Sequence, residues 1–143
     1  MKNILVLTLV STLIFGCSST SMTLNEKDTA YSKYIAEENF SSKEKVIGFK
    51  FSGWKALSDN YLIITAVHKK DYLIETKGRC YDLYYSEGIK LNRSSKLAIY
   101  KLGDSISPIG ITTGKCFIKS IYPITSSQSD YLVNIGKPGV NEN

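Results

Sequence analysis

Short segments with a period of two residues dominate the middle of the chain, and they constrain its fold more than any other feature. Ile47, Phe49 and Phe51 fall on one face of an extended segment and Lys50 on the other, as in a strand with one buried face. Six or seven short strands without long helices between them predict a mainly β fold, a small antiparallel barrel or sandwich. The further segments, rich in branched and aromatic residues and bounded by turn residues, are 61–67, 72–76, 88–91, 96–101 and 116–124.

One short helix is expected before these strands. Tyr31, Tyr34 and Ile35 recur near helical spacing, with charged residues on the opposite side. This pattern predicts a helix over about residues 28–38, which packs its apolar face on the β domain.

The N-terminus predicts export and lipid attachment. Residues 4–15 are nearly all apolar and follow a basic residue, but a helix needs about 20 apolar residues to cross a bilayer, so the run is typical of a signal peptide. Ile14-Phe15-Gly16-Cys17 resembles a bacterial lipobox, in which the cysteine receives diacylglycerol before cleavage. An ordinary secretory signal is the alternative, although residues 11–22 contain no alanine for its cleavage site. We therefore expect acyl chains such as palmitate on Cys17, and Ser18 after it favours the outer membrane.

The chain that remains is long enough for one domain with a modest core. The segment after Cys17 is rich in serine and threonine and lacks an apolar period, so it is expected to be flexible. The expected regions are a lipoprotein signal peptide at 1–16, a flexible tether at 17–29, a single β-rich domain at 30–124, and a polar C-terminal tail at 125–143 in which residues 131–133 are a candidate edge strand.

The three cysteines divide into one lipid-attachment residue and one pair. With Cys17 carrying lipid, Cys80 and Cys116 remain, and two thiols in an oxidising compartment suggest one disulfide bond. Two separate buried thiols are the alternative. A bridge would close a loop of roughly 37 residues and so restrict the unfolded chain strongly.

The formal net charge of +5 is unevenly distributed. Residues 45–124 carry thirteen basic and six acidic side chains, whereas residues 18–44 carry three basic and five acidic ones. A basic domain beside a membrane predicts an anionic envelope component as partner, such as lipid headgroups, lipopolysaccharide phosphates or acidic glycan. Solvated loop charges are the alternative explanation, and a periplasmic protein is the other candidate partner. Nucleic acid is not expected as a partner of an envelope protein.

A resemblance to a known family rests on the order of several residues. Trp54 precedes two strand segments and Cys80, and Asp104 precedes Cys116, which opens a Cys-x-Ile sequence. This order resembles an uncharacterised family of short proteobacterial envelope proteins, a domain of unknown function, over roughly residues 31–124. The resemblance implies one bridge between Cys80 and Cys116. It implies no activity, cofactor or catalytic residue.

The sequence indicates no catalytic or metal-binding set. His68, the one histidine, stands in a charged turn, and a metal site or an acid–base pair needs partners. There is no Gly-x-Ser-x-Gly elbow for a nucleophile. Residues 110–116 superficially resemble a phosphate-binding loop, but the motif is one residue short and leads into a strand, so we reject it. We expect no cofactor and no metal.

Two hypotheses concern ligand binding. Asp104 either contacts a ligand or is a turn residue that accepts hydrogen bonds from backbone amides. The aromatic residues either form a platform for sugars or peptides or pack in the β core. The candidate binding residues are Trp54, Arg79, Tyr81, Tyr84, Tyr85 and Asp104.

These features predict an outer-membrane lipoprotein that faces the periplasm and has a non-catalytic binding or structural role in the envelope. The alternative is an inhibitor or chaperone of a periplasmic enzyme, which inserts the loop of residues 107–115 into an active site. A small hydrolase using Asp104 is the least favoured hypothesis.

Overall fold

The structure is a computed structural model that describes residues 21–110 and 114–138. The expected signal peptide, the lipidation residue Cys17 and the first part of the expected tether lie outside these described residues. Residues 111–113 of the candidate inhibitory loop also lie outside them. The expected start of that loop is wrong, because residues 107–109 belong to a barrel strand, Ser105–Ile109.

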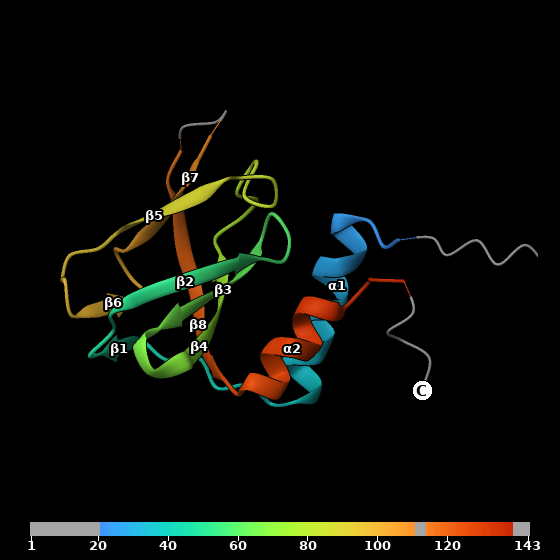
Figure 1. Cartoon of the computed structure of the whole chain (residues 1–143), viewed down its shortest axis with the longest axis horizontal. Coiled ribbons are helices and arrows are strands. Elements are labelled where there is room, and N and C mark those ends of the chain that lie inside the picture. Colours follow the sequence, from blue (N-terminus) through green and yellow to red (C-terminus); the bar gives the residue numbers. More distant parts are fainter. Residues whose placement is uncertain (1–20, 111–113, 139–143) are drawn as a thin grey trace, which may run out of the picture.

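Six antiparallel strands form a near-closed barrel (Figure 1). The mainly β fold predicted from the period of two is therefore confirmed, and it is a barrel. A two-stranded antiparallel ribbon pairs β1 (Lys45–Ile47) with β6 (Ala98–Tyr100), and a 3₁₀ turn, η1 (Val67–Lys69), joins β3 to β4. The order around the barrel is β2 (Phe51–Ala56), β3 (Tyr61–Ala66), β4 (Lys70–Thr76), β8 (Cys116–Ile124), β7 (Ser105–Ile109) and β5 (Gly88–Asn92).

An apolar core fills the barrel. Leu62 and Ile64 of β3 lie two residues apart and belong to this core, as the period of a strand requires. Trp54 of β2 is half-buried against the same core. The other large, fully buried side chains of the core are Phe49, Ile74, Leu83, Ile99, Ile106, Ile118 and Ile121.

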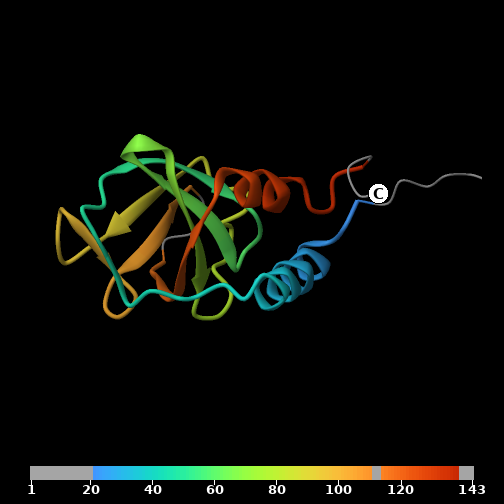
Figure 2. The same ribbon diagram turned by 90° about the horizontal axis from the view of Figure 1, so that it is seen from below.

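A second core lies outside the barrel, beneath two helices. Ile63 of β3 and Leu73 of β4 belong to it, together with Tyr31 and Leu132 from the helices. Figure 2 shows both helices on one side of the barrel. Because both faces of β3 are buried, residues 61–66 are almost continuously apolar instead of alternating with polar residues.

Helix α1 (Leu24–Glu37) begins earlier than the predicted helix and replaces half of the expected tether. Thr23 and Glu26 form a capping box, in which the Thr23 side chain accepts from the Glu26 amide and Glu26 accepts from the Thr23 amide. These hydrogen bonds hold the pKa of the exposed Glu26 carboxyl below its usual range. The prediction missed this start because the first helical turn carries little apolar periodicity.

The prediction of an edge strand at residues 131–133 is wrong, because these residues lie in helix α2 (Ser126–Asn134). A second capping box, between Thr125 and Gln128, begins this helix. Leu132 is buried in the second core, and the Tyr131 ring stacks on Tyr34 of α1 with centroids 4.5 Å apart. Within the described residues, no helix is long and apolar enough to cross a membrane.

The two ends of the described chain meet at Gly136. Its φ of +73° lies in the left-handed region, and a β-carbon placed there would come within 2.9 Å of the Met22 β-carbon. Glycine is therefore required at this position by both its backbone conformation and the close approach of the N-terminal segment.

Candidate functional site

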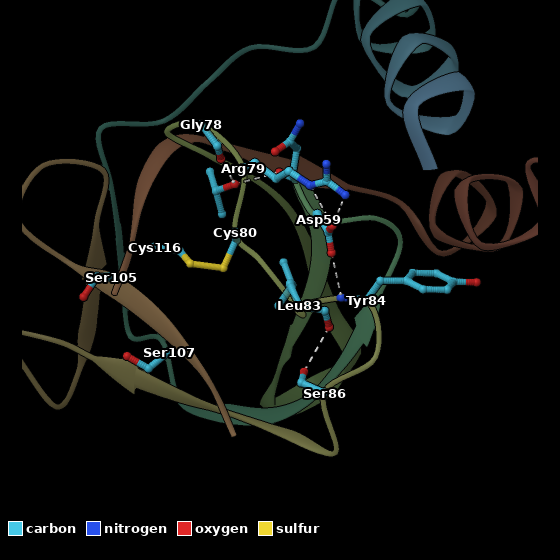
Figure 3. Close-up of a disulfide and its surroundings, with 12 residues drawn as sticks. Asp59, Gly78, Arg79, Cys80, Leu83, Tyr84, Ser86, Ser105, Ser107 and Cys116 are labelled. Atoms are coloured by element: carbon cyan, nitrogen blue, oxygen red, sulfur yellow. Dashed lines mark hydrogen bonds and ion pairs between the residues drawn. A yellow bond between two sulfur atoms is a disulfide. The ribbon is translucent and has the colours of Figure 1, made fainter. Parts of the chain in front are cut away.

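Four of the candidate binding residues lie in one short segment, residues 79–86, which we call the 79–86 turn. Its Cys80 forms a disulfide with Cys116 at the start of β8, with the Cα atoms 5.5 Å apart (Figure 3). Leu83 of the same turn is fully buried in the barrel core. The disulfide predicted from the cysteine count is therefore present, and it ties the turn to the barrel wall.

Asp59 is the second anchor of the 79–86 turn. Its buried carboxylate accepts from Arg79 Nε and lies within 3.0 Å of Arg79 Nη2, and its other oxygen accepts from the Tyr84 amide at 3.3 Å (Figure 3). The Asp59 carbonyl also accepts from the Cys80 amide at 2.8 Å. One residue of the β2–β3 connection thus fixes three positions of the turn.

The outer surface of the turn is aromatic and basic. Tyr81 and Tyr85 are 65% and 76% exposed, respectively, and Tyr84 is half-buried. The Arg79 guanidinium lies 5.4 Å from the centre of the Tyr81 ring, and the Tyr84 and Tyr85 rings meet edge to face at 5.0 Å. The Lys27 ammonium of α1 lies 5.1 Å from the centre of the Tyr84 ring. We call these five residues the aromatic–basic face.

Trp54 and Asp104 are not part of the aromatic–basic face. Trp54 packs on the barrel core from β2. Asp104 is only 1% exposed and accepts from the Ser94 amide, the Ser94 hydroxyl and the Tyr100 amide at 3.0, 3.1 and 2.8 Å. Its carboxylate therefore organises its own loop, as the turn interpretation of this residue predicted.

Asp59 was not among the candidate residues predicted from the sequence. A carboxylate in a turn carries no sign of a partner twenty positions later, because their contact depends on the fold.

A polar seam joins α1 to the barrel next to this region. Asn60 Nδ2 donates to Asp28 Oδ2 at 2.8 Å, while Asp28 Oδ1 and Asn60 Oδ1 are buried without a partner among the described residues. Burial raises the pKa of the Asp28 carboxyl, and the nearby Ser58 hydroxyl and Asn60 amide offset part of this effect. Both residues line two small polar pockets, of about 250 and 100 Å³.

The arrangement predicts that Asp28→Asn stabilises the protein at neutral pH. An amide at position 28 can donate to the unpartnered Asn60 oxygen and still accept from Asn60 Nδ2, which we expect to raise the free energy of unfolding by about 1 kcal/mol. Because the pKa of Asp28 is raised in the folded state, its ionisation destabilises the fold as the pH rises above the usual carboxyl pKa. The advantage of Asp28→Asn should therefore be largest at pH 7 and shrink towards pH 3, as measured by urea unfolding.

Asn60→Asp is the matched control for this prediction. It places a second carboxylate beside Asp28, so it should lower the free energy of unfolding at pH 7 and recover part of the loss on acidification. A constant difference between Asp28→Asn and the wild type at every pH would contradict the interpretation.

One further carboxylate and two hydroxyl groups near the seam already form hydrogen bonds. Glu75 accepts from Lys119 at 2.7 Å and from the Tyr61 hydroxyl at 3.3 Å. Burial raises the pKa of the Tyr61 and Tyr31 hydroxyls, which keeps both as neutral donors, and Tyr31 donates to the Leu57 carbonyl.

In the part of the chain that the structure describes, no group of three or more His, Cys, Asp or Glu side chains is arranged to hold a metal ion.

Comparison with known proteins places the chain in a family. Residues 1–134 match the model of a family of unknown function, DUF6491. The chain belongs to DUF6491. This agrees with the resemblance that the order of Trp54, Cys80, Asp104 and Cys116 suggested. No curated protein and no solved structure matches this DUF6491 chain.

Proposed function

We propose that this DUF6491 protein is an outer-membrane lipoprotein that faces the periplasm and binds an envelope component or a protein partner without catalysing a reaction. The observation that carries the proposal is the exposure of Tyr81 and Tyr85 on a turn that a disulfide and the Asp59 carboxylate hold in place. The lipid on Cys17 would keep this turn close to the membrane.

A rigid turn with exposed tyrosines favours binding for an entropic reason. Tyrosine offers a large contact area with few rotatable bonds, so little conformational freedom is lost when it contacts a partner. The 79–86 turn is also fixed before any contact forms, which lowers the cost of association further. Large exposed aromatic side chains on such a turn are otherwise unfavourable in water.

The charges of the aromatic–basic face favour an anionic partner. Arg79 uses Nε and Nη2 for Asp59, and Nη1 has no partner among the described residues, so it can donate to a phosphate or carboxylate. The Lys27 ammonium lies 3.4 Å from the Tyr84 hydroxyl oxygen and adds a second positive charge.

Photo-crosslinking in living cells tests the proposal. A photoreactive phenylalanine analogue at Tyr81 or Tyr85 is expected to capture a specific envelope partner, with the protein recovered in the outer-membrane fraction. The same analogue at Tyr131, a tyrosine that is half exposed on α2, is the matched control and should capture nothing specific. Equal or absent capture at Tyr81, Tyr85 and Tyr131 under all growth conditions would contradict the proposal.

A further inference from the structure

The end of the barrel formed by β1 and β6 carries exposed aliphatic side chains among lysines. Ile47 is 66% exposed and Leu97 is 58% exposed. Lys45, Lys50 and Lys96 are exposed around them, and none of the three forms an ion pair among the described residues. We call these five residues the β1–β6 ridge.

The backbone places the two exposed aliphatic residues on neighbouring segments. β1 pairs with β6 so that Ile47 lies opposite Ala98, the residue next to Leu97. The Phe49 amide donates to the Leu97 carbonyl at 2.9 Å, which closes the contact between the two segments. In β1, Val46 packs on the barrel core, so Lys45 and Ile47 on either side of it point outward.

The loop that carries Leu97 is held firmly. Arg93 Nη1 lies within hydrogen-bonding distance of the carbonyls of Phe49, Lys96 and Ala98, at 3.2–3.4 Å, and its guanidinium stacks on the Phe49 ring. Asp104 fixes the same loop through Ser94. The exposure of Leu97 is therefore a fixed feature of the fold and does not result from a loose loop.

Unpaired lysines on the ridge reflect the charge balance of the whole barrel. Of the six carboxylates in residues 45–124, Asp59 and Glu75 pair with Arg79 and Lys119, and Asp104 is buried. With thirteen basic and six acidic side chains in residues 45–124, the barrel has a net positive charge, and its exposed lysines attract anionic groups.

We infer that the β1–β6 ridge docks on a lipid bilayer with anionic headgroups, as a second contact beside the lipid on Cys17. The inference rests on the proposed attachment to a membrane. Branched aliphatic tips can enter the boundary between headgroups and acyl chains while lysines around them contact the phosphates. A protein partner is less well matched, because lysine is depleted at the cores of protein interfaces, where aromatic residues and arginine are enriched. Figure 1 places β1 and β6 at the end of the long axis away from α1, so the two contacts together would hold the molecule lying along the membrane.

The test uses the full acylated protein with an environment-sensitive fluorophore on a single introduced cysteine. Cys80 and Cys116 are paired and Cys17 carries lipid, so the cysteine introduced by Ile47→Cys is the one thiol that reacts with the fluorophore. Ile109→Cys is the matched control, because Ile109 is 54% exposed and lies at the end of β7, away from the ridge (Figure 1). The proteins are incorporated into vesicles of phosphatidylcholine alone or of phosphatidylcholine with phosphatidylglycerol.

The inference predicts a blue shift of the fluorophore at position 47, and quenching by doxyl-labelled lipids, in the phosphatidylglycerol vesicles only. Position 109 should show neither effect. Combining Lys45→Glu, Lys50→Glu and Lys96→Glu with Ile47→Cys should reduce the shifted fraction about tenfold, and high salt should act in the same direction.

Three results would overturn the inference. They are an unchanged emission at position 47 while the protein is bound to the vesicles, an equal shift at positions 47 and 109, and a shift that appears only when a protein extract of the envelope is added. Failure of the proposed lipid attachment gives a different result, because the protein would then not sediment with either kind of vesicle and its intact mass would lack the acyl chains.

Discussion

Replacing Cys80 and Cys116 together by alanine is expected to lower the free energy of unfolding by about 4 kcal/mol. The two residues are 36 positions apart, and on the chain-entropy account a cross-link of that span removes about this much freedom from the unfolded chain. For a domain of this size the loss is a large share of the total stability. Urea unfolding of the oxidised protein and of the variant, at the same pH, gives the difference.

Reduction provides the control for this experiment. Dithiothreitol should destabilise the wild type by a similar amount and leave the double variant unchanged. Hydrogen exchange should also quicken in the 79–86 turn of the variant, since the turn loses its covalent anchor and keeps only Asp59 and the buried Leu83. A variant within about 0.5 kcal/mol of the wild type would contradict the structural role of the bridge.

Asp104→Ala is expected to cost about 3–4 kcal/mol. The buried carboxylate accepts three hydrogen bonds, and its removal leaves the Ser94 and Tyr100 amides without their acceptor. The effect should appear in the urea unfolding of the variant at neutral pH, with the disulfide intact. Residues 93–104, which include β6, should exchange their amide hydrogens faster than in the wild type.

Two substitutions control the Asp104 result. Asp104→Asn keeps the shape and one acceptor oxygen, so its cost should be about half as large. Glu87→Ala removes an exposed carboxylate that accepts no hydrogen bond among the described residues, and its effect should stay within about 0.5 kcal/mol. An Asp104→Ala protein as stable as Glu87→Ala would show that the loop does not depend on this carboxylate.

Four of the six barrel strands, β3, β4, β5 and β8, could be predicted from the sequence because their signal is local. β3 and β4 combine branched residues with bounding turns, and the inner side chains of β3 recur every second residue. The expected strand through Ile47, Phe49 and Phe51 is wrong, because Gly48 turns the chain with a φ of +73° and leaves Ile47 exposed, so that β2 begins only at Phe51. β7 was missed because its residues 107–109 were assigned to a loop. The disulfide could also be predicted from the sequence, because an oxidising compartment and two remaining cysteines suggest a bridge without any knowledge of the geometry.

Helix α2 and the role of Asp59 could not be predicted in the same way. α2 is short, and its two buried positions, Ser129 and Leu132, give too little apolar period to distinguish it from a strand. The Thr125–Gln128 capping box was its only clear local sign. The role of Asp59 depends on its contact with Arg79, which only the folded chain brings about. The aromatic–basic face likewise combines residues of α1 and of the 79–86 turn, which lie about fifty residues apart in the sequence.

The meeting of Met22 and Gly136 determines how a mechanical load enters the molecule. A force applied at residue 21 acts first on the packing of α1 against α2 and the outer side of β3 and β4, because these elements share the second core. The barrel strands are joined to that path through the outer faces of β3 and β4 and, beyond α1, through two hydrogen bonds between residues 42–43 and Ile121 of β8. A force on the N-terminus would therefore pull the helices away from the barrel and leave the barrel closed. Detachment of the helices and unfolding of the barrel would then be separate events.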